Sequence, residues 1–186
     1  MGLRIEKSFQ VNEPIDKVWS FLSDPTKVAT CVPGAQITEK VDDKTYRGAI
    51  SVKVGPSVTD YKGELQIVRL DAETHELEML GKGQDVRGRG SASMTMTGKL
   101  ATLEGGATQV TSTSEVNVVG ILAQMGARVI TEVSNIMFEK FSKNFQALLQ
   151  SPEELPATGT DGRATPIKAG SLAWQAGKRL FKREES

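Results

Sequence analysis

The chain has 186 residues, in which 23 lysine and arginine residues balance 23 aspartate and glutamate residues, and it has one cysteine. That length suits one domain with a tail, and a single cysteine excludes an intrachain disulfide. No run of roughly eighteen apolar residues predicts a spanning helix, and no basic stripe through the body favours nucleic acid. We therefore expect a cytoplasmic protein that at most lies on a membrane surface.

The first predicted elements are one strand and two short helices. Residues 3–11 alternate between apolar and polar side chains, which predicts a strand. Asn12 and Pro14 then open a helix, because proline is favoured in a first helical turn. This helix ends before Pro25, and a second short helix is expected over about residues 26–30.

A series of antiparallel strands is predicted for the middle of the chain. Turn residues recur at 42–43, 55–56, 71–73, 84–85 and 104–106. Apolar residues alternate with a period of two between these turns, which predicts about six strands. Connections this short require antiparallel pairing, since parallel pairing needs a long crossover.

One long helix is predicted from Gly120 to about Gln150. Apolar residues, among them Val129, Val133 and Ile136, recur there at steps of three and four. The helix would be roughly 45 Å long. The order of elements predicts an α+β helix-grip fold, in which a curved antiparallel sheet of about seven strands wraps around the helix and leaves an internal apolar cavity.

The composition favours such a cavity. Aromatic residues make up only 5% of the chain, and five of the six methionines fall on predicted strands or on the long helix. Methionine suits adaptable apolar pockets, although methionine at core spacing is more often simply core. Two serines share a strand face with Val110 and Val116, and they could bond a ligand carbonyl only if that face points inward. The predicted lining comprises Met79, Met94, Met96, Ser112, Ser114, Leu122, Met125, Val129 and Val133.

No catalytic group and no metal site is predicted. His75, the only histidine, lies beside a turn without converging partners. Cys31 has no second cysteine and more plausibly packs beside the following Pro-Gly turn than acts as a nucleophile. The glycine-rich stretch at 81–90 lacks nucleotide-binding spacing and predicts a hairpin, with Arg87 and Arg89 as candidates for the cavity mouth or a partner contact.

The C-terminal segment predicts membrane binding. Residues 151–166 contain three prolines and two glycines, typical of a flexible linker. Residues 167–186 form a basic amphipathic pattern that suits an anionic membrane surface. The alternatives are a helix docked on its own domain and a disordered basic end. The predicted membrane-binding residues are Trp174, Lys178, Arg179, Leu180, Phe181, Lys182 and Arg183.

Several short motifs resemble the CoxG family of carbon monoxide dehydrogenase subunits, a branch of the START-like, polyketide-cyclase-type (SRPBCC) superfamily. They are Pro-Ile-Asp-Lys-Val-Trp at 14–19, Cys-Val-Pro-Gly-Ala at 31–35, Val-Gly-Pro at 54–56 and Val-Val-Gly-Ile-Leu-Ala at 118–123. The resemblance covers about residues 2–150. It implies a cavity-bearing accessory protein that molybdenum hydroxylases need for membrane association.

The expected function combines the cavity, the tail and the resemblance. We expect a non-enzymatic protein that binds a respiratory quinone (menaquinone or ubiquinone) or another lipid, without a covalent cofactor. It would tether a carbon monoxide dehydrogenase-like molybdenum hydroxylase to the inner face of the cytoplasmic membrane and couple it to the respiratory chain. Two alternatives stay open: a cyclase or hydrolase, which needs an acid–base cluster in the cavity, and a hydroxylase assembly factor with an incidental cavity.

Overall fold

A computed structural model of the chain describes residues 1–150, so the predicted linker and the predicted membrane-binding residues lie outside the described residues. One antiparallel sheet of seven strands has the order β1-β7-β6-β5-β4-β3-β2. The strands are β1 (Gly2–Val11), β2 (Ala35–Lys40), β3 (Thr45–Val54), β4 (Ser57–Asp71), β5 (Glu76–Asp85), β6 (Gly90–Thr102) and β7 (Thr108–Gly120). The helices are α1 (Ile15–Leu22), α2 (Pro25–Cys31), η1 (Glu104–Gly106), α3 (Ile121–Gln124) and α4 (Ala127–Gln150). The predicted α+β helix-grip fold is confirmed.

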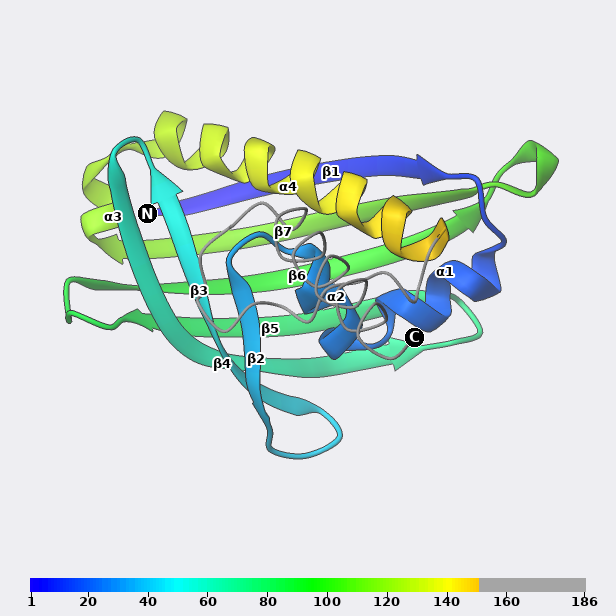
Figure 1. The fold of residues 1–186 in the computed structure, drawn as a ribbon, viewed down its shortest axis with the longest axis horizontal. Coiled ribbons are helices and arrows are strands. Elements are labelled where there is room, and N and C mark those ends of the chain that lie inside the picture. Colours follow the sequence, from blue (N-terminus) through cyan, green and yellow to red (C-terminus); the bar gives the residue numbers. More distant parts are fainter. Residues whose placement is uncertain (151–186) are drawn as a thin grey trace, which may run out of the picture.

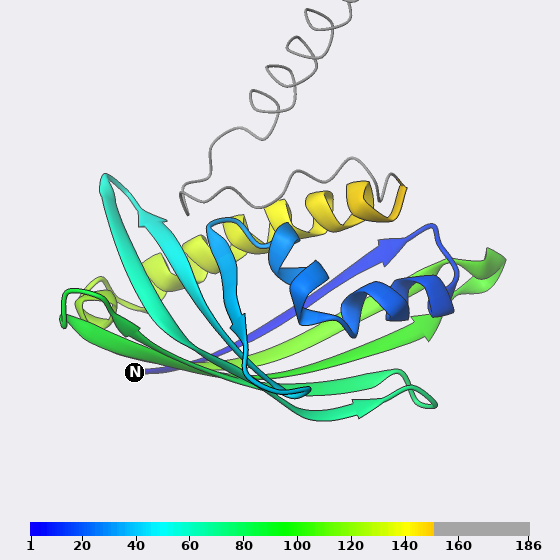
Figure 2. The ribbon, with the colours of Figure 1, turned by 60° about the horizontal axis from the view of Figure 1, so that its bottom comes forward.

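The sheet curves into a trough, and α4 lies along its concave side (Figures 1 and 2). The two short helices α1 and α2 lie beside the C-terminal end of α4. At the opposite end, α3 connects β7 to the start of α4. We call the concave face of the sheet the inner face and the convex face the outer face.

Three glycines in register allow the sheet to bend. Gly48 of β3 pairs with Gly63 of β4, which pairs with Gly83 of β5. A Cβ at Gly63 would overlap the carbonyl oxygen of Lys82 and lie 2.7 Å from the Cα of Gly83. The strands approach each other this closely only because these positions carry no side chain.

The predicted single helix over 120–150 is wrong in one respect, because it is broken into α3 and α4. The break falls at Gly126, whose φ of 86° lies in the left-handed region that glycine adopts without steric cost. Ile136, predicted for the apolar stripe of this helix, is 54% exposed. Phe145 and Leu148 of the same predicted stripe are buried, and Ile130 is buried as well.

The two short helices are fixed by local bonds and by bonds to distant strands. The side chain of Asp24 accepts a hydrogen bond from Thr26 N at 3.0 Å and caps α2. The buried hydroxyl of Thr108 in β7 donates to the carbonyl oxygen of Glu13 at 2.7 Å. Asn144 of α4 donates to the carbonyl oxygen of Cys31 at 3.0 Å, which joins α2 to α4.

The core of the described residues consists of two clusters of buried side chains rather than one. The first, at the end near α1 and α2, contains Val11, Val18, Cys31, Leu100, Val110, Phe145, Leu148 and Leu149. The second, over β3, β4 and β5, contains Tyr46, Ile67, Leu77 and Met79. Trp19 of α1 packs against both clusters and therefore connects them.

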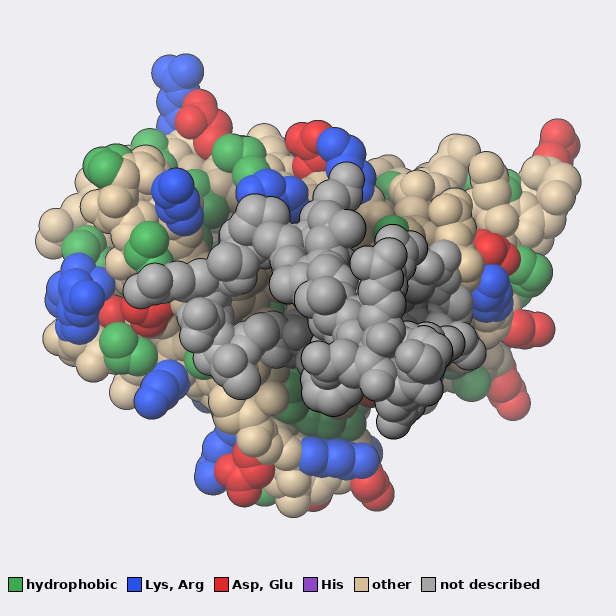
Figure 3. Space-filling model, in the orientation of Figure 1, with side chains coloured by type: hydrophobic (Ala, Val, Ile, Leu, Met, Phe, Trp, Pro, Cys, Tyr) green, Lys and Arg blue, Asp and Glu red, His purple; other side chains and the backbone are tan. Residues whose placement is uncertain are grey.

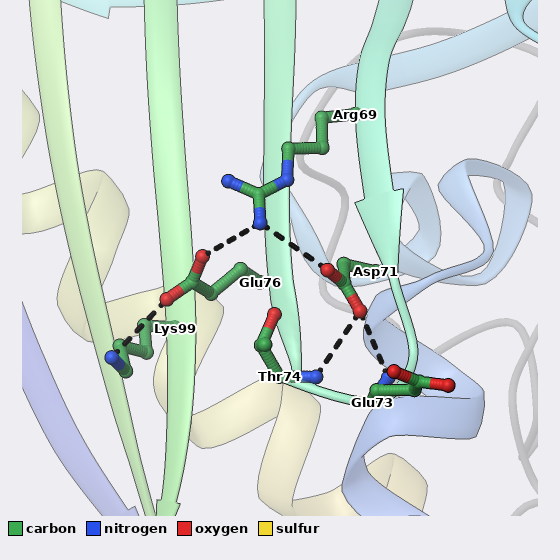
Figure 4. Close-up of polar contacts among 6 residues, drawn as sticks. All are labelled: Arg69, Asp71, Glu73, Thr74, Glu76 and Lys99. Atoms are coloured by element: carbon green, nitrogen blue, oxygen red, sulfur yellow. Dashed lines mark hydrogen bonds and ion pairs between the residues drawn. The ribbon is translucent and has the colours of Figure 1, made fainter.

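An ionic network holds the turn between β4 and β5 (Figure 4). Asp71 accepts hydrogen bonds from the backbone N–H groups of Glu73 and Thr74 at 3.0 and 3.1 Å. The guanidinium of Arg69 lies 3.2 Å from both Asp71 and Glu76, and Lys99 of β6 lies 3.1 Å from Glu76. The network fixes the turn that carries His75.

Candidate ligand-binding site

The predicted sheet residues of the cavity share the inner face. Met96 of β6 pairs with Met79 of β5 and with Ser114 of β7, and Met79 belongs to the second core cluster. Because side chains alternate along a strand, Met94 and Ser112 point to the same side. The face that the two serines share with Val110 therefore points inward, since Val110 is part of the first core cluster.

Much of this apolar lining is only half-buried. Met79 is 8% exposed, whereas Met94, Met96, Ser112 and Ser114 are half-buried. Leu65 of β4 and Val116 of β7, on the same face, are also half-buried. Apolar side chains that face a covering helix and still retain accessible surface indicate that sheet and helix do not close over them.

The predicted helical residues of the lining come from two segments. Val129 and Val133 belong to α4 and are half-buried. Leu122 belongs to α3, and Met125 lies directly after it at the break between the helices, where both are half-buried. The connecting segment and the first half of α4 therefore lie near the part of the sheet that stays partly open.

The second half of α4 is closed against the sheet by aromatic rings. Phe9 of β1 contacts Phe138, Phe141 and Phe145 edge to face, with centroids 5.7, 6.2 and 6.1 Å apart. Such contacts add to the stability that burial alone provides. The contrast with the first half of α4 places the candidate ligand space toward the α3 end of the domain.

A polar group lies on the inner face at this end. The carboxylate of Asp85, whose side chain is 0% exposed, accepts hydrogen bonds from the Arg89 backbone N–H at 3.0 Å and from its Nε at 2.7 Å. The hydrogen bond from Arg89 lowers the pKa of Asp85, and the same bond raises the pKa of Arg89. Arg89, a sequence-based candidate for the cavity mouth, is thus paired within its own hairpin.

Tyr61 pairs with Asp85 across β4 and β5 and is 4% exposed. Its hydroxyl has no hydrogen-bond partner, and among the buried side-chain polar atoms of residues 1–150 it alone is unpaired. Burial raises the pKa of Tyr61, and the charge of Asp85 raises it further. The predicted lining did not include Tyr61, although a tyrosine in the inward phase of a strand was the available clue.

The histidine and the cysteine occupy structural positions. The Nε2 of His75 lies 3.6 Å from Asp16 Oδ1, and its ring meets Trp19. Cys31 is fully buried in the first core cluster, and burial raises the pKa of its thiol. Across residues 1–150, no three His, Cys, Asp or Glu side chains come together as a metal site. None of the helices in that same range is long and apolar enough to span a bilayer.

Two open hollows lie on the outer face. The larger, of about 800 Å³, is lined by exposed residues that alternate with the inward glycines, including Lys62, Glu64, Lys82 and Gln84. The smaller, of about 540 Å³, lies beside it over β1, β5, β6 and β7. Several charged side chains, among them Lys62, Glu64 and Lys82, line the larger hollow, whereas pockets for lipophilic ligands contain only a few polar groups.

The charges on the helix-bearing face are mixed. Figure 3 shows basic and acidic side chains interspersed around the rim of this face, with hydrophobic side chains between them. This part of the described surface offers an extended polyanion no continuous basic track.

Comparison with known proteins identifies both a family and a fold. Residues 8–150 match the family model for CoxG, a subunit of carbon monoxide dehydrogenase. No curated protein sequence matches the chain significantly.

Three solved structures share the fold at low sequence identity. A conserved protein from Geobacillus kaustophilus aligns with a TM-score of 0.73 and 21% identity, over 80% of this chain and 96% of that one. The Zhui aromatase/cyclase from Streptomyces sp. R1128 aligns with a TM-score of 0.54 and 16% identity, over 86% of this chain and 99% of that one. A START superfamily protein from Mycobacterium smegmatis aligns with a TM-score of 0.57 and 11% identity, over 80% of this chain and 98% of that one. These likenesses show a START-like fold.

Proposed function

The chain belongs to the CoxG family of carbon monoxide dehydrogenase subunits, and we propose that it is a non-enzymatic protein that binds a respiratory quinone between its sheet and α4. The observation that carries this proposal is the half-buried apolar lining on the inner face, including Met94, Met96 and Val116. Apolar surface left open beneath a helix suits the long isoprenoid tail of a quinone. Flexible methionine side chains can adapt to such a tail.

The family name supports a carbon monoxide dehydrogenase-like molybdenum hydroxylase as the partner. We propose that the protein tethers this enzyme to the inner face of the cytoplasmic membrane. The tether would be the basic segment of residues 167–186, which carries five basic side chains between Lys168 and Arg183. Each contributes about 1 kcal/mol near an anionic leaflet before losses, which favours reversible attachment. The bound quinone would then accept the electrons that the hydroxylase releases.

An enzymatic role for this chain has one observation in its favour, the buried pair of Tyr61 and Asp85 on the inner face. A cyclase or hydrolase needs a group that can take up and return a proton near neutral pH. Asp85 is instead held ionised by Arg89, which lowers its pKa, while the pKa of Tyr61 is raised. Both shifts move the pKa values of these groups farther from neutral pH, which favours a binding role over acid–base catalysis.

The proposal is tested with the full chain and vesicles of phosphatidylcholine and phosphatidylglycerol that contain menaquinone. After incubation, sedimentation measures membrane binding, and extraction of the protein followed by mass spectrometry measures quinone uptake. The wild type is expected to sediment in low salt and to carry quinone when it is released by high salt. A protein that takes up no quinone from these vesicles would refute the proposal.

Two sets of variants separate the ligand site from the tether. Val116→Trp, on the inner face, should still sediment with the vesicles but should carry no quinone. Glu115 is the exposed neighbour of Val116 on the outer face, and Glu115→Trp should behave as the wild type. Trp174→Glu combined with Phe181→Glu should remain in the supernatant. Addition of a purified carbon monoxide dehydrogenase to the vesicles then tests recruitment. An enzyme that stays in the supernatant with the wild type would contradict the tethering role.

A further inference from the structure

The phenol ring of Tyr61 lies over the floor of the inner face. A Cβ added at Gly83 would lie 3.6 Å from the Cβ of Tyr61 and 3.8 Å from its Cδ1. Two residues along the same strand, a Cβ at Gly81 would lie 3.7 Å from Met94 Cε and 4.0 Å from Leu65 Cδ1. The ring therefore lies over Gly83, one inward position along β5 from Gly81, over which the half-buried side chains of Met94 and Leu65 lie.

The hydroxyl of Tyr61 is buried and has no hydrogen-bond partner. A buried hydroxyl without a partner destabilises the fold, so native proteins almost always pair such groups with protein, water or ligand. Its strand neighbour Asp85 does not fill this role: the carboxylate accepts from the backbone and guanidinium of Arg89, and no hydrogen bond joins it to the Tyr61 hydroxyl. The hydroxyl thus retains its full capacity to donate a hydrogen bond.

We infer that the hydroxyl of Tyr61 donates a hydrogen bond to a carbonyl oxygen of the lipophilic ligand and thereby fixes the ligand's polar head at this end of the inner face. The inference rests on the proposed function, since it names the group that holds the head of the proposed quinone. A tyrosine phenol is protonated at neutral pH, as a donor must be, and burial raises the pKa of Tyr61 further.

Two kinds of ligand present a carbonyl next to a long apolar chain. A quinone has ring carbonyls beside an isoprenoid tail, and a phospholipid has ester carbonyls beside acyl chains. Either tail could lie along Met94, Leu65 and Val116. A phospholipid must also bury a charged headgroup, and beside Tyr61 the buried carboxylate of Asp85 and the partly exposed guanidinium of Arg89 are already paired with each other. The neutral quinone head therefore fits this end better.

The experiment compares the wild-type full chain with Tyr61→Phe and with Tyr46→Phe. Tyr46 is the chain's other tyrosine, is 5% exposed and lies in the second core cluster, so it controls for loss of a buried phenol. The probes are a short-chain ubiquinone, an isoprenoid hydrocarbon of similar length without carbonyls, and a dioleoyl phosphatidylcholine. Binding is titrated for each probe, and thermal unfolding is recorded without ligand.

Tyr61→Phe should change two properties in opposite directions. It should raise the unfolding temperature of the ligand-free protein, because it removes an unpaired buried hydroxyl. It should also weaken ubiquinone binding about three- to tenfold, the range of one hydrogen bond, without changing hydrocarbon binding. The carbonyl stretching band of bound ubiquinone should lie at lower frequency in the wild type than in Tyr61→Phe. Tyr46→Phe should leave ubiquinone binding and the carbonyl band unchanged.

The results separate this inference from the proposed function. Equal ubiquinone affinity and an unshifted carbonyl band in Tyr61→Phe would overturn the role of Tyr61 and leave the quinone site standing. A wild type that binds phosphatidylcholine but not ubiquinone, with the affinity loss in Tyr61→Phe, would support the carbonyl donor and reject the quinone. A wild type that binds none of the three probes would overturn both.

Discussion

The ring of Trp19 meets the ring of His75 edge to face, with the centroids 5.5 Å apart and the planes at 86°. Trp19 lies in α1 and His75 lies in the turn between β4 and β5, so this contact joins the helix to that end of the sheet. His75 has a φ of 54°, in the left-handed region, where asparagine, aspartate and histidine are more common than other residues that carry a side chain. The turn network in Figure 4 supports that conformation.

Replacement of His75 tests this contact. His75→Ala loses the edge-to-face contact and replaces histidine, which is enriched in the left-handed region, with a residue that is not, so the free energy of unfolding should fall by about 1–2 kcal/mol. His75→Asn should cost less, because asparagine tolerates that conformation. Urea unfolding measures both variants. Equal losses would show that the ring contact alone, and not the backbone conformation, determines the effect.

The bend of the sheet depends on Gly63. Gly63→Ala places a Cβ against the carbonyl oxygen of Lys82 and 2.7 Å from the Cα of Gly83, and neither backbone atom can move without shifting its strand. The free energy of unfolding of this variant should fall by about 3 kcal/mol or more, or the variant should fail to fold. Gly81→Ala is the matched control, since its nearest neighbour would be the flexible end of Met94 at 3.7 Å. Circular dichroism and urea unfolding should find Gly81→Ala close to the wild type.

The ion pair between the buried carboxylate of Asp85 and the partly exposed Arg89 predicts a pH dependence. The pKa of Asp85 is lowered in the folded protein, so the pair stabilises the fold fully above the unfolded-state pKa of about 4. That stabilisation is lost as the pH falls through the folded-state pKa. Asp85→Asn should be less stable than the wild type at neutral pH, and the gap should narrow below about pH 4. Urea unfolding across this range measures it.

The exposed carboxylate of Glu64 provides the control for this titration. Glu64→Gln should stay close to the wild type across the same pH range, because an exposed ion pair contributes little. A constant gap between Asp85→Asn and the wild type down to low pH would show that the ionised carboxylate is not what stabilises the hairpin.

The thiol of Cys31 should be inert in the folded protein. It is fully buried, and burial raises its pKa, so thiolate is scarce at neutral pH. A chromogenic disulfide reagent should react only as the protein unfolds in urea, and the reaction should follow the unfolding transition. Rapid labelling of the native protein would show that the α2 end opens locally.

The alternation of residues along strands was sufficient to predict which residues share a face, but not whether that face points inward or which residues meet across it. A period of two places Ser114 on the same face as Val110, and only the burial of Val110 in the core shows that this face points inward. The pairing of Tyr61 with Asp85 depends on the register between β4 and β5, which shifts between Ile67 and Arg69. Counted from the β4–β5 turn, this irregularity moves every pair beyond it by one residue, including that of Tyr61 and Asp85.

The helix break and the sheet bend were missed for a related reason. Gly126 interrupts an apolar pattern that continues on both sides, and only the backbone shows its positive φ. Likewise, Gly48, Gly63 and Gly83 are far apart in sequence and become one bend only when three strands are in register. Local patterns predict elements, whereas contacts between elements require the assembled sheet.

The filling of the interior can be tested at Ser114, which is half-buried on the inner face opposite Met96. If the space beneath α4 is open, Ser114→Leu places its added methyl groups there without overpacking, so stability should be unchanged or raised and quinone uptake should fall. If the space is filled, the same change should lower the free energy of unfolding by about 1–3 kcal/mol. Val110→Leu is the control, because Val110 lies on the same strand face but is only 7% exposed in the first core cluster. It should be destabilising in either case. Losses of similar size in both variants, measured by urea unfolding, would refute an open ligand space and with it the proposed quinone site.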